Sequence, residues 1–185
     1  MMRLATSVVA MSAVVVLPPE ALKLDLSSVL RVVDEQPLEQ WSVTDRTFRF
    51  IWIPPFPSMR MLSVRIQELP GELQLAARAA EWQYDKGLGV VPVRIDSRLD
   101  RQLTPAEWDQ VASMREDGFW KFHPQAYPQP YHDGSIWVLE GSAGGERLRI
   151  VQHVPQPSAF KSLCQKMLSL FNLRLREQEL SVSSP

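Results

Sequence analysis

The three histidines of this sequence and two carboxylates near them are the first candidates for chemistry. They are His123, His132, His153, Asp133 and Glu140. Imidazole and carboxylate groups bind zinc or iron and transfer protons, so a hydrolase or another metal-dependent enzyme using His123, His132, Asp133 and Glu140 is one hypothesis. Successive histidines are nine and twenty-one residues apart, which matches no helical ligand pair such as His-x-x-x-His. The spacing therefore favours histidines on solvated loops.

The remaining signals for catalysis have structural explanations. Asp133 precedes Gly134, and Asp-Gly is a turn signal. Glu140 follows the apolar run 136–139, so we expect a surface carboxylate at the end of a strand. Cys164 lies on an apolar helical stripe, which predicts a buried, unreactive thiol. The sequence contains no phosphate-binding glycine loop, nucleophile elbow or dinucleotide fingerprint, and we predict no catalytic residue, metal or cofactor.

A segment rich in proline and aromatic residues, 122–132, supports a different class of function. Tyrosines held by prolines lose little entropy on contact, which favours recognition. The loop 54–61 offers a second contact patch. The predicted binding residues are Phe122, His123, Tyr127, Tyr131, His132, Phe56 and Met59. We expect a non-catalytic binding protein of the inhibitor or immunity type, with a protein as its partner; alternatively, both segments only cover the core.

Alternating apolar residues predict the strands that must position these segments. Phe48, Phe50 and Trp52 alternate with Arg49, Ile51 and Ile53, and both faces of this strand look covered. Further strands are predicted over 62–67, 72–85, 91–95, 136–139 and 147–154. The stretch 72–85 also fits a helix, but the turns on either side of it favour the strand. Proline at position 92 places the fourth strand at a sheet edge, and the continuous apolar run 136–139 predicts an interior strand.

Capping signals predict two helices. Thr104, Pro105 and Glu107 form a capping box with proline at the first helical position, which predicts a helix over 105–117. Ser158 caps a last helix whose apolar residues repeat as far as Phe171. The glycines of 141–145 predict the turn of a hairpin. The chain is therefore predicted to be an α+β protein with an antiparallel meander of about five to six strands and two helices packed on one face.

Length and composition fix the class of protein. The 185 residues suit one domain, and 45% hydrophobic with 22% charged residues exclude wholesale disorder. A net charge of -1 gives no reason to expect a nucleic-acid partner. A single cysteine excludes an intrachain disulfide. We expect a single α+β domain over 25–173 and a flexible tail over 174–185.

The first residues have the pattern of a secretory signal. Met1, Met2 and Arg3 precede an apolar run over 4–17, which is shorter than the ~20 residues of a membrane-spanning helix. We predict no integral membrane span, and a signal-peptide-like or disordered N-terminus over 1–24. Export to the periplasm is favoured over a cytoplasmic location, and a structural role in the envelope is then a third hypothesis. A buried first element, or a start codon read too far upstream, is the alternative.

Several motifs resemble those of a group of uncharacterised bacterial α+β proteins. The resemblance covers roughly 47–171 and is carried by 104–108 (TPAEW), 118–120 (GFW), 133–141 (DGSIWVLEG) and the leucine-rich last helix. It implies a fold and, for some members, export, but no established activity. This chain departs from the group in its last strand, where Arg147-Leu148 and His153 replace an aromatic–histidine pair and a tryptophan.

Overall fold

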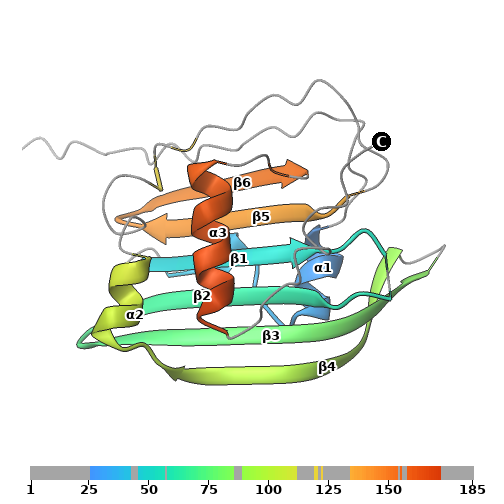
Figure 1. Cartoon of the computed structure of the whole chain (residues 1–185), viewed down its shortest axis with the longest axis horizontal. Coiled ribbons are helices and arrows are strands. Elements are labelled where there is room, and N and C mark those ends of the chain that lie inside the picture. The colour runs from blue at the N-terminus through green and yellow to red at the C-terminus, as the bar shows by residue number, and fades with distance from the viewer. Residues whose placement is uncertain are drawn as a thin grey trace, which may run out of the picture.

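The fold is a six-stranded antiparallel sheet with the strand order β4-β3-β2-β1-β5-β6. The computed structural model describes residues 26–42, 46–56, 58–85, 89–111, 119–120, 122, 134–153, 155 and 158–171. Its elements are α1 (Leu26–Val32), η1 (Leu38–Gln40), β1 (Arg46–Ile53), β2 (Met61–Leu69), β3 (Glu72–Asp85), β4 (Gly89–Gln102), α2 (Pro105–Gln110), β5 (Ile136–Ala143), β6 (Glu146–His153) and α3 (Ala159–Ser169). Figure 1 shows them with α3 crossing the strands. This confirms the predicted α+β class and the antiparallel sheet.

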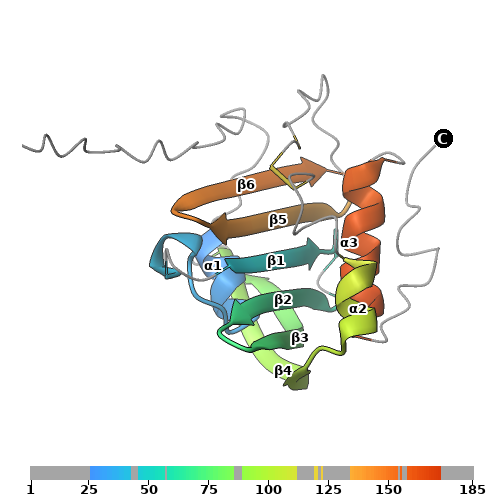
Figure 2. The ribbon, with the colours of Figure 1, turned by 90° about the vertical axis from the view of Figure 1, so that its left-hand side faces the viewer.

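Helices lie on both faces of the sheet. Seen edge-on, α2 and α3 pack on one face, as predicted, and α1 packs on the other (Figure 2). Thr104 caps α2 through the predicted box, and the Ser158 side chain accepts a hydrogen bond from the backbone of Lys161 at the start of α3. Both capping signals therefore fix a helix start, as expected from their chemistry.

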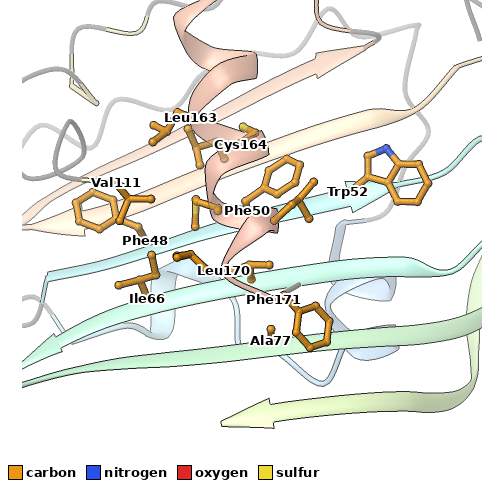
Figure 3. Packing of buried hydrophobic residues seen from close by; sticks show 14 of the residues in the cluster. Phe48, Phe50, Trp52, Ile66, Ala77, Val111, Leu163, Cys164, Leu170 and Phe171 are labelled. Carbon is orange, nitrogen blue, oxygen red and sulfur yellow. The ribbon is translucent and has the colours of Figure 1, made fainter. Parts of the chain in front are cut away.

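The larger core lies between the sheet and α3. Phe48, Phe50 and Trp52 project from β1 toward this side and are at most 2% exposed. They meet Leu163 and Cys164 of α3, and Leu170 and Phe171 just after it, as Figure 3 shows. Cys164 is buried, as predicted, and burial raises the pKa of its thiol well above the ordinary value. The period-two pattern of β1 thus decides which side chains the last helix covers.

The predicted edge and interior strands are confirmed. Pro92 lies on β4, which forms one edge of the sheet. β5 lies between β1 and β6, and its residues 137–142 are all buried, so its side chains are covered on both faces of the sheet. Its pairing with β6 is the predicted hairpin. Proline has no backbone N–H to donate. It is therefore tolerated in an edge strand, which has a neighbouring strand on one side only.

Two boundaries differ from the sequence interpretation. The turn predicted over 141–145 is shorter, since β5 continues to Ala143 and only Gly144 and Gly145 turn, with φ of 59° and 87°. Gly141 lies inside β5, where the Phe119 ring occupies the space of a side chain. The second difference is at α2, which ends at Gln110, before the predicted end at residue 117; residues 112–118 lie outside the described part of the chain.

Two elements were not anticipated, the helix α1 and the short helix η1. α1 is only seven residues long and has no acidic residue in its first turn. Val29, Leu30, Val32 and Val33 pack it onto the second face of the sheet. No helix among the described residues is long and apolar enough to cross a membrane. The predictions for 1–24 and 174–185 concern residues outside the described part.

Candidate functional site

The second face of the sheet contains a row of buried charges. Arg49 of β1 pairs with Glu140 of β5, which pairs in turn with Arg149 of β6. The side chains of Arg49 and Glu140 are both 0% exposed. Charges leave water only when other charges and hydrogen bonds replace the lost hydration, so these groups must satisfy one another.

Glu140 is held by two arginines. Nε of Arg49 donates to Oε2 of Glu140 at 2.8 Å, and Nη2 of Arg49 donates to the same oxygen. Nε of Arg149 donates to Oε1 at 2.6 Å. The expected surface carboxylate is therefore wrong: Glu140 is interior, and both of its oxygens accept charge-assisted hydrogen bonds. A carboxylate with both oxygens occupied in this way connects β1, β5 and β6.

The same arginines bind the chain that follows α1. Nη1 of Arg49 donates to the carbonyl of Gln36 at 2.6 Å and to Glu35 at 3.4 Å. The guanidinium of Arg49 also lies 4.7 Å from the centre of the Trp41 ring, a cation–π arrangement. We call residues 33–41 the strap, since they cross the second face between α1 and β5.

Two arginines of β6 hold the far end of the strap. Nη2 of Arg147 donates to the carbonyl of Trp41 at 2.8 Å. Nη2 of Arg149 donates to Glu39 at 3.3 Å. Hydrogen bonds to guanidinium groups contribute more than neutral ones, so these contacts fix the strap to the sheet.

Glu35 is the second buried carboxylate of the cluster. Its side chain is 2% exposed and lies 3.4 Å from Arg49 and 3.5 Å from Arg65. Burial raises the pKa of Glu35 above its ordinary value of 4.5, although Arg65, Arg49 and Arg78 act in the opposite direction. Desolvation thus outweighs the attraction of the arginines at this position.

This balance predicts a pH effect. A carboxyl whose pKa is raised on folding keeps its proton in the folded state after the unfolded chain has lost it, so it destabilises the fold as the pH rises above 4.5. We expect the stability of Glu35→Gln relative to the unmodified protein to rise between pH 4.5 and 8, as measured by urea unfolding at each pH.

Glu81 provides a control of opposite sign. Its hydrogen bonds with Arg94 lower the pKa of its carboxyl. This group stabilises the fold above the unfolded pKa, and the stabilisation disappears as the pH falls through the folded pKa. Glu81→Gln should therefore lose relative stability as the pH rises toward 4.5 and should change little between pH 4.5 and 8, where Glu35→Gln gains. If the relative stabilities of the two variants changed equally with pH, the pH effect could not be assigned to the raised pKa of Glu35.

The predicted histidine site is not assembled by the described residues. His153 is the last residue of β6 and is half-buried, so it is not the solvated loop residue that was expected. Burial lowers its pKa, against a hydrogen bond with the backbone of Gly134. His123, His132 and Asp133 lie outside the described residues. In the described part of the chain, no three His, Cys, Asp or Glu residues are grouped as metal ligands.

Comparison with protein-family models, curated proteins and solved structures gives no match. Geometry alone must therefore support a functional assignment.

The structure describes three of the predicted aromatic and methionine binding residues. Phe56 is 45% exposed, whereas Met59 is half-buried and packs against the core. Phe122 is half-buried and packs edge-to-face on Phe160, with ring centres 6.1 Å apart. Tyr127 and Tyr131 lie outside the described residues.

The buried ion cluster was not recognised from sequence. Its one signal is a charged residue inside an apolar strand: Arg49 within FRFIWI, and Glu140 within IWVLEG. A charge at such a position requires a buried partner of opposite sign. The partner is 91 residues away in the chain, and only the register of β1 with β5 identifies it.

Proposed function

We propose that this chain is a non-catalytic binding protein that contacts a protein partner at one end of its sheet. The contact surface, which we call the aromatic end, comprises the loop 54–60 and the segment 122–132. An inhibitor or immunity-type role is consistent with such a surface. The observation that carries the proposal is the exposure of Phe56, which is 45% accessible beside a strand whose other aromatic residues are buried.

The strand register supports joining the two segments into one surface. Ile53, the last residue of β1, pairs with Ile136, the first residue of β5. The loop after β1 therefore begins beside Gly134 and Ser135, the two residues that precede β5. In the sequence these two residues come shortly after the segment 122–132.

Fixed ends reduce the entropy lost when such segments bind. The carbonyl of Met59 accepts a hydrogen bond from Nε1 of Trp82 at 2.9 Å, which fixes the end of the loop 54–60 to β3. Phe122 packs on Phe160 of α3, and the backbone of Gly134 bonds to His153 of β6. Because preorganised contacts lose less freedom on association, anchoring favours recognition.

The alternative of a hydrolase or metal-dependent enzyme has less support. It requires Glu140 together with His123, His132 and Asp133. Glu140 is 0% exposed and bonded to Arg49 and Arg149, on the face where the strap lies. A carboxylate in that position cannot reach a substrate without displacing the strap.

Photo-crosslinking tests the aromatic end directly. A photoreactive phenylalanine analogue at position 56 should give an adduct with one protein of defined mass in cells expressing the full chain. The matched control is position 93, since Val93 is also apolar and is 52% exposed on β4. Adducts at both positions with the same proteins would contradict a specific contact.

Affinity for the captured partner provides the quantitative test. Phe56→Ala should weaken binding about 10-fold or more, as for an aromatic residue at the centre of an interface. Val93→Ala should change the affinity less than about 2-fold. Tyr127→Ala and Tyr131→Ala should weaken binding without lowering the melting temperature. Unchanged affinity in all three aromatic variants would overturn the proposal.

A further inference from the structure

The outer edge of β4 is open for pairing with another strand. β4 is the first strand in the order of the sheet, so β3 is its only neighbour among the described strands, and Figure 1 shows it along the lower edge. An edge strand presents unpaired N–H and C=O groups, and proteins usually keep such strands short. β4 is instead 14 residues long. Its length makes it the more extended of the two edges of the sheet.

The two halves of β4 differ in regularity. Pro92 and two shifts in the register with β3 interrupt the half that precedes residue 97. A proline and irregular pairing both protect an edge, because they prevent a continuous ladder with another strand. Residues 97–102, in contrast, pair with 74–79 without interruption. This regular half is therefore the part of β4 that can accept a further strand.

The backbone of Arg98 and of Asp100 points away from β3. The N–H of Leu103 donates to the carbonyl of Leu73 at 2.8 Å, so the backbone of Leu103 faces β3. In an antiparallel pair, successive residues of a strand face the neighbour and face away from it in alternation. Along the uninterrupted register, Leu99 therefore also faces β3. Arg98 and Asp100 consequently present their N–H and C=O groups to the open edge.

The charges of these two residues make the edge complementary to itself. Arg98 and Asp100 flank Leu99, and their side chains are 53% and 61% exposed. A second copy that pairs antiparallel about Leu99 brings Arg98 opposite Asp100 of that copy, and Asp100 opposite its Arg98. Pairing about Arg98 or about Asp100 would place two like charges directly opposite each other, which is destabilising. The charges thus select one register and favour a copy of the same strand.

The ion pairs within the chain are compatible with this arrangement. Arg98 lies 3.0 Å from Asp34, and Asp100 lies 2.9 Å from Arg78. A guanidinium group has five N–H donors and a carboxylate has about four acceptor positions, so each can bind a second partner. We propose that the chain forms a homodimer in which residues 97–101 of β4 pair antiparallel with the same residues of a second copy. The two sheets then join edge to edge.

Sedimentation velocity of the full chain over a range of concentrations tests this pairing. A reversible monomer–dimer equilibrium is expected. Arg98→Asp and Asp100→Arg each bring like charges together across the two-fold axis, so each should weaken self-association about 10-fold or more. An equimolar mixture of the two variants should dimerise like the unmodified protein, because every charge then faces its opposite. A monomer at all concentrations, or a mixture that stays monomeric, would overturn the proposal.

Arg94→Asp is the matched control for charge. It makes the same change in charge on the same strand, at a side chain that is 66% exposed but lies in the irregular half. Its dimerisation constant should change less than about 2-fold. If Arg94→Asp weakened the dimer as much as Arg98→Asp does, the effect would come from net charge, and the proposed pairing would be wrong.

Cysteine crosslinking tests the register without altering the charges. In the proposed dimer residue 99 faces itself, with Cα atoms about 5 Å apart, so Leu99→Cys should give a disulfide-linked dimer on mild oxidation. Ser97→Cys is the control, because its two copies would lie about 13 Å apart along the strands, too far for a disulfide. The buried Cys164 is present in both variants. Equal crosslinking at the two positions, or a dimer that crosslinks at neither, would contradict pairing about Leu99.

Discussion

Replacing Arg49 by methionine is expected to lower the free energy of unfolding by about 3–5 kcal/mol. The substitution keeps much of the side-chain volume but removes the charge that faces Glu140 and Glu35, both at most 2% exposed. It also removes the donor to the Gln36 carbonyl. Chemical denaturation at neutral pH measures the loss, and a lower unfolding midpoint with an unchanged slope is the expected signature.

Two further variants separate burial from charge. Arg94→Met removes an arginine that is 66% exposed and paired with Glu81, so its unfolding midpoint should stay nearly unchanged. Combining Arg49→Met with Glu140→Leu should cost less than the sum of the single variants, because neither charge then remains without its partner. Additive losses, or a mild effect of Arg49→Met alone, would show that the cluster does not hold the strap.

Replacing Gly141 by valine is expected to destabilise the fold by about 3 kcal/mol. A Cβ atom at this position would overlap Cε1 and Cζ of Phe119 and would lie 3.1 Å from Cδ1 of Phe48. These two rings pack edge-to-face with centres 5.1 Å apart, so neither can move without breaking an aromatic contact. Thermal unfolding followed by circular dichroism measures the loss.

Phe119 provides the control for Gly141. Phe119→Ala alone should cost about 3–5 kcal/mol, since its ring is fully buried. In the Phe119→Ala background, valine at position 141 should cost much less, because the ring that it overlaps is gone. An unchanged cost in that background would place the clash elsewhere in β5.

Local chemistry was sufficient to predict most of the fold. The alternation in β1 and the cap residues Thr104 and Ser158 act within a few residues of one another, so their structures follow from short-range sterics and hydrogen bonds. α1 was not predicted because it is only seven residues long and its buried residues pack against strands that lie far away in the sequence. Gly141 was predicted to be a turn residue. In a sequence, a glycine that is needed for close packing cannot be distinguished from one that is needed for a positive φ.

The candidate sites depend on register, which the sequence does not show. Arg49 and Glu140 meet only when β1 and β5 pair with one particular alignment, and a shift of one residue would place them on opposite faces. The same holds for the uninterrupted pairing of 97–102 with 74–79, which directs the backbone of Arg98 and Asp100 to the open edge. The loop that carries Phe56, in contrast, was predicted, because Pro54, Pro55 and Pro57 end the strand through local sterics.

The strap also imposes an order of events on the growing polypeptide. Trp41 and Glu39 leave the ribosome early, but their donors Arg147 and Arg149 follow 106 and 110 residues later. Contacts so distant in sequence form only after the intervening strands exist, which slows their closure. Glu39 and Trp41 therefore gain these two contacts only late in synthesis, whereas Gln36 needs only Arg49, 13 residues away, for its own.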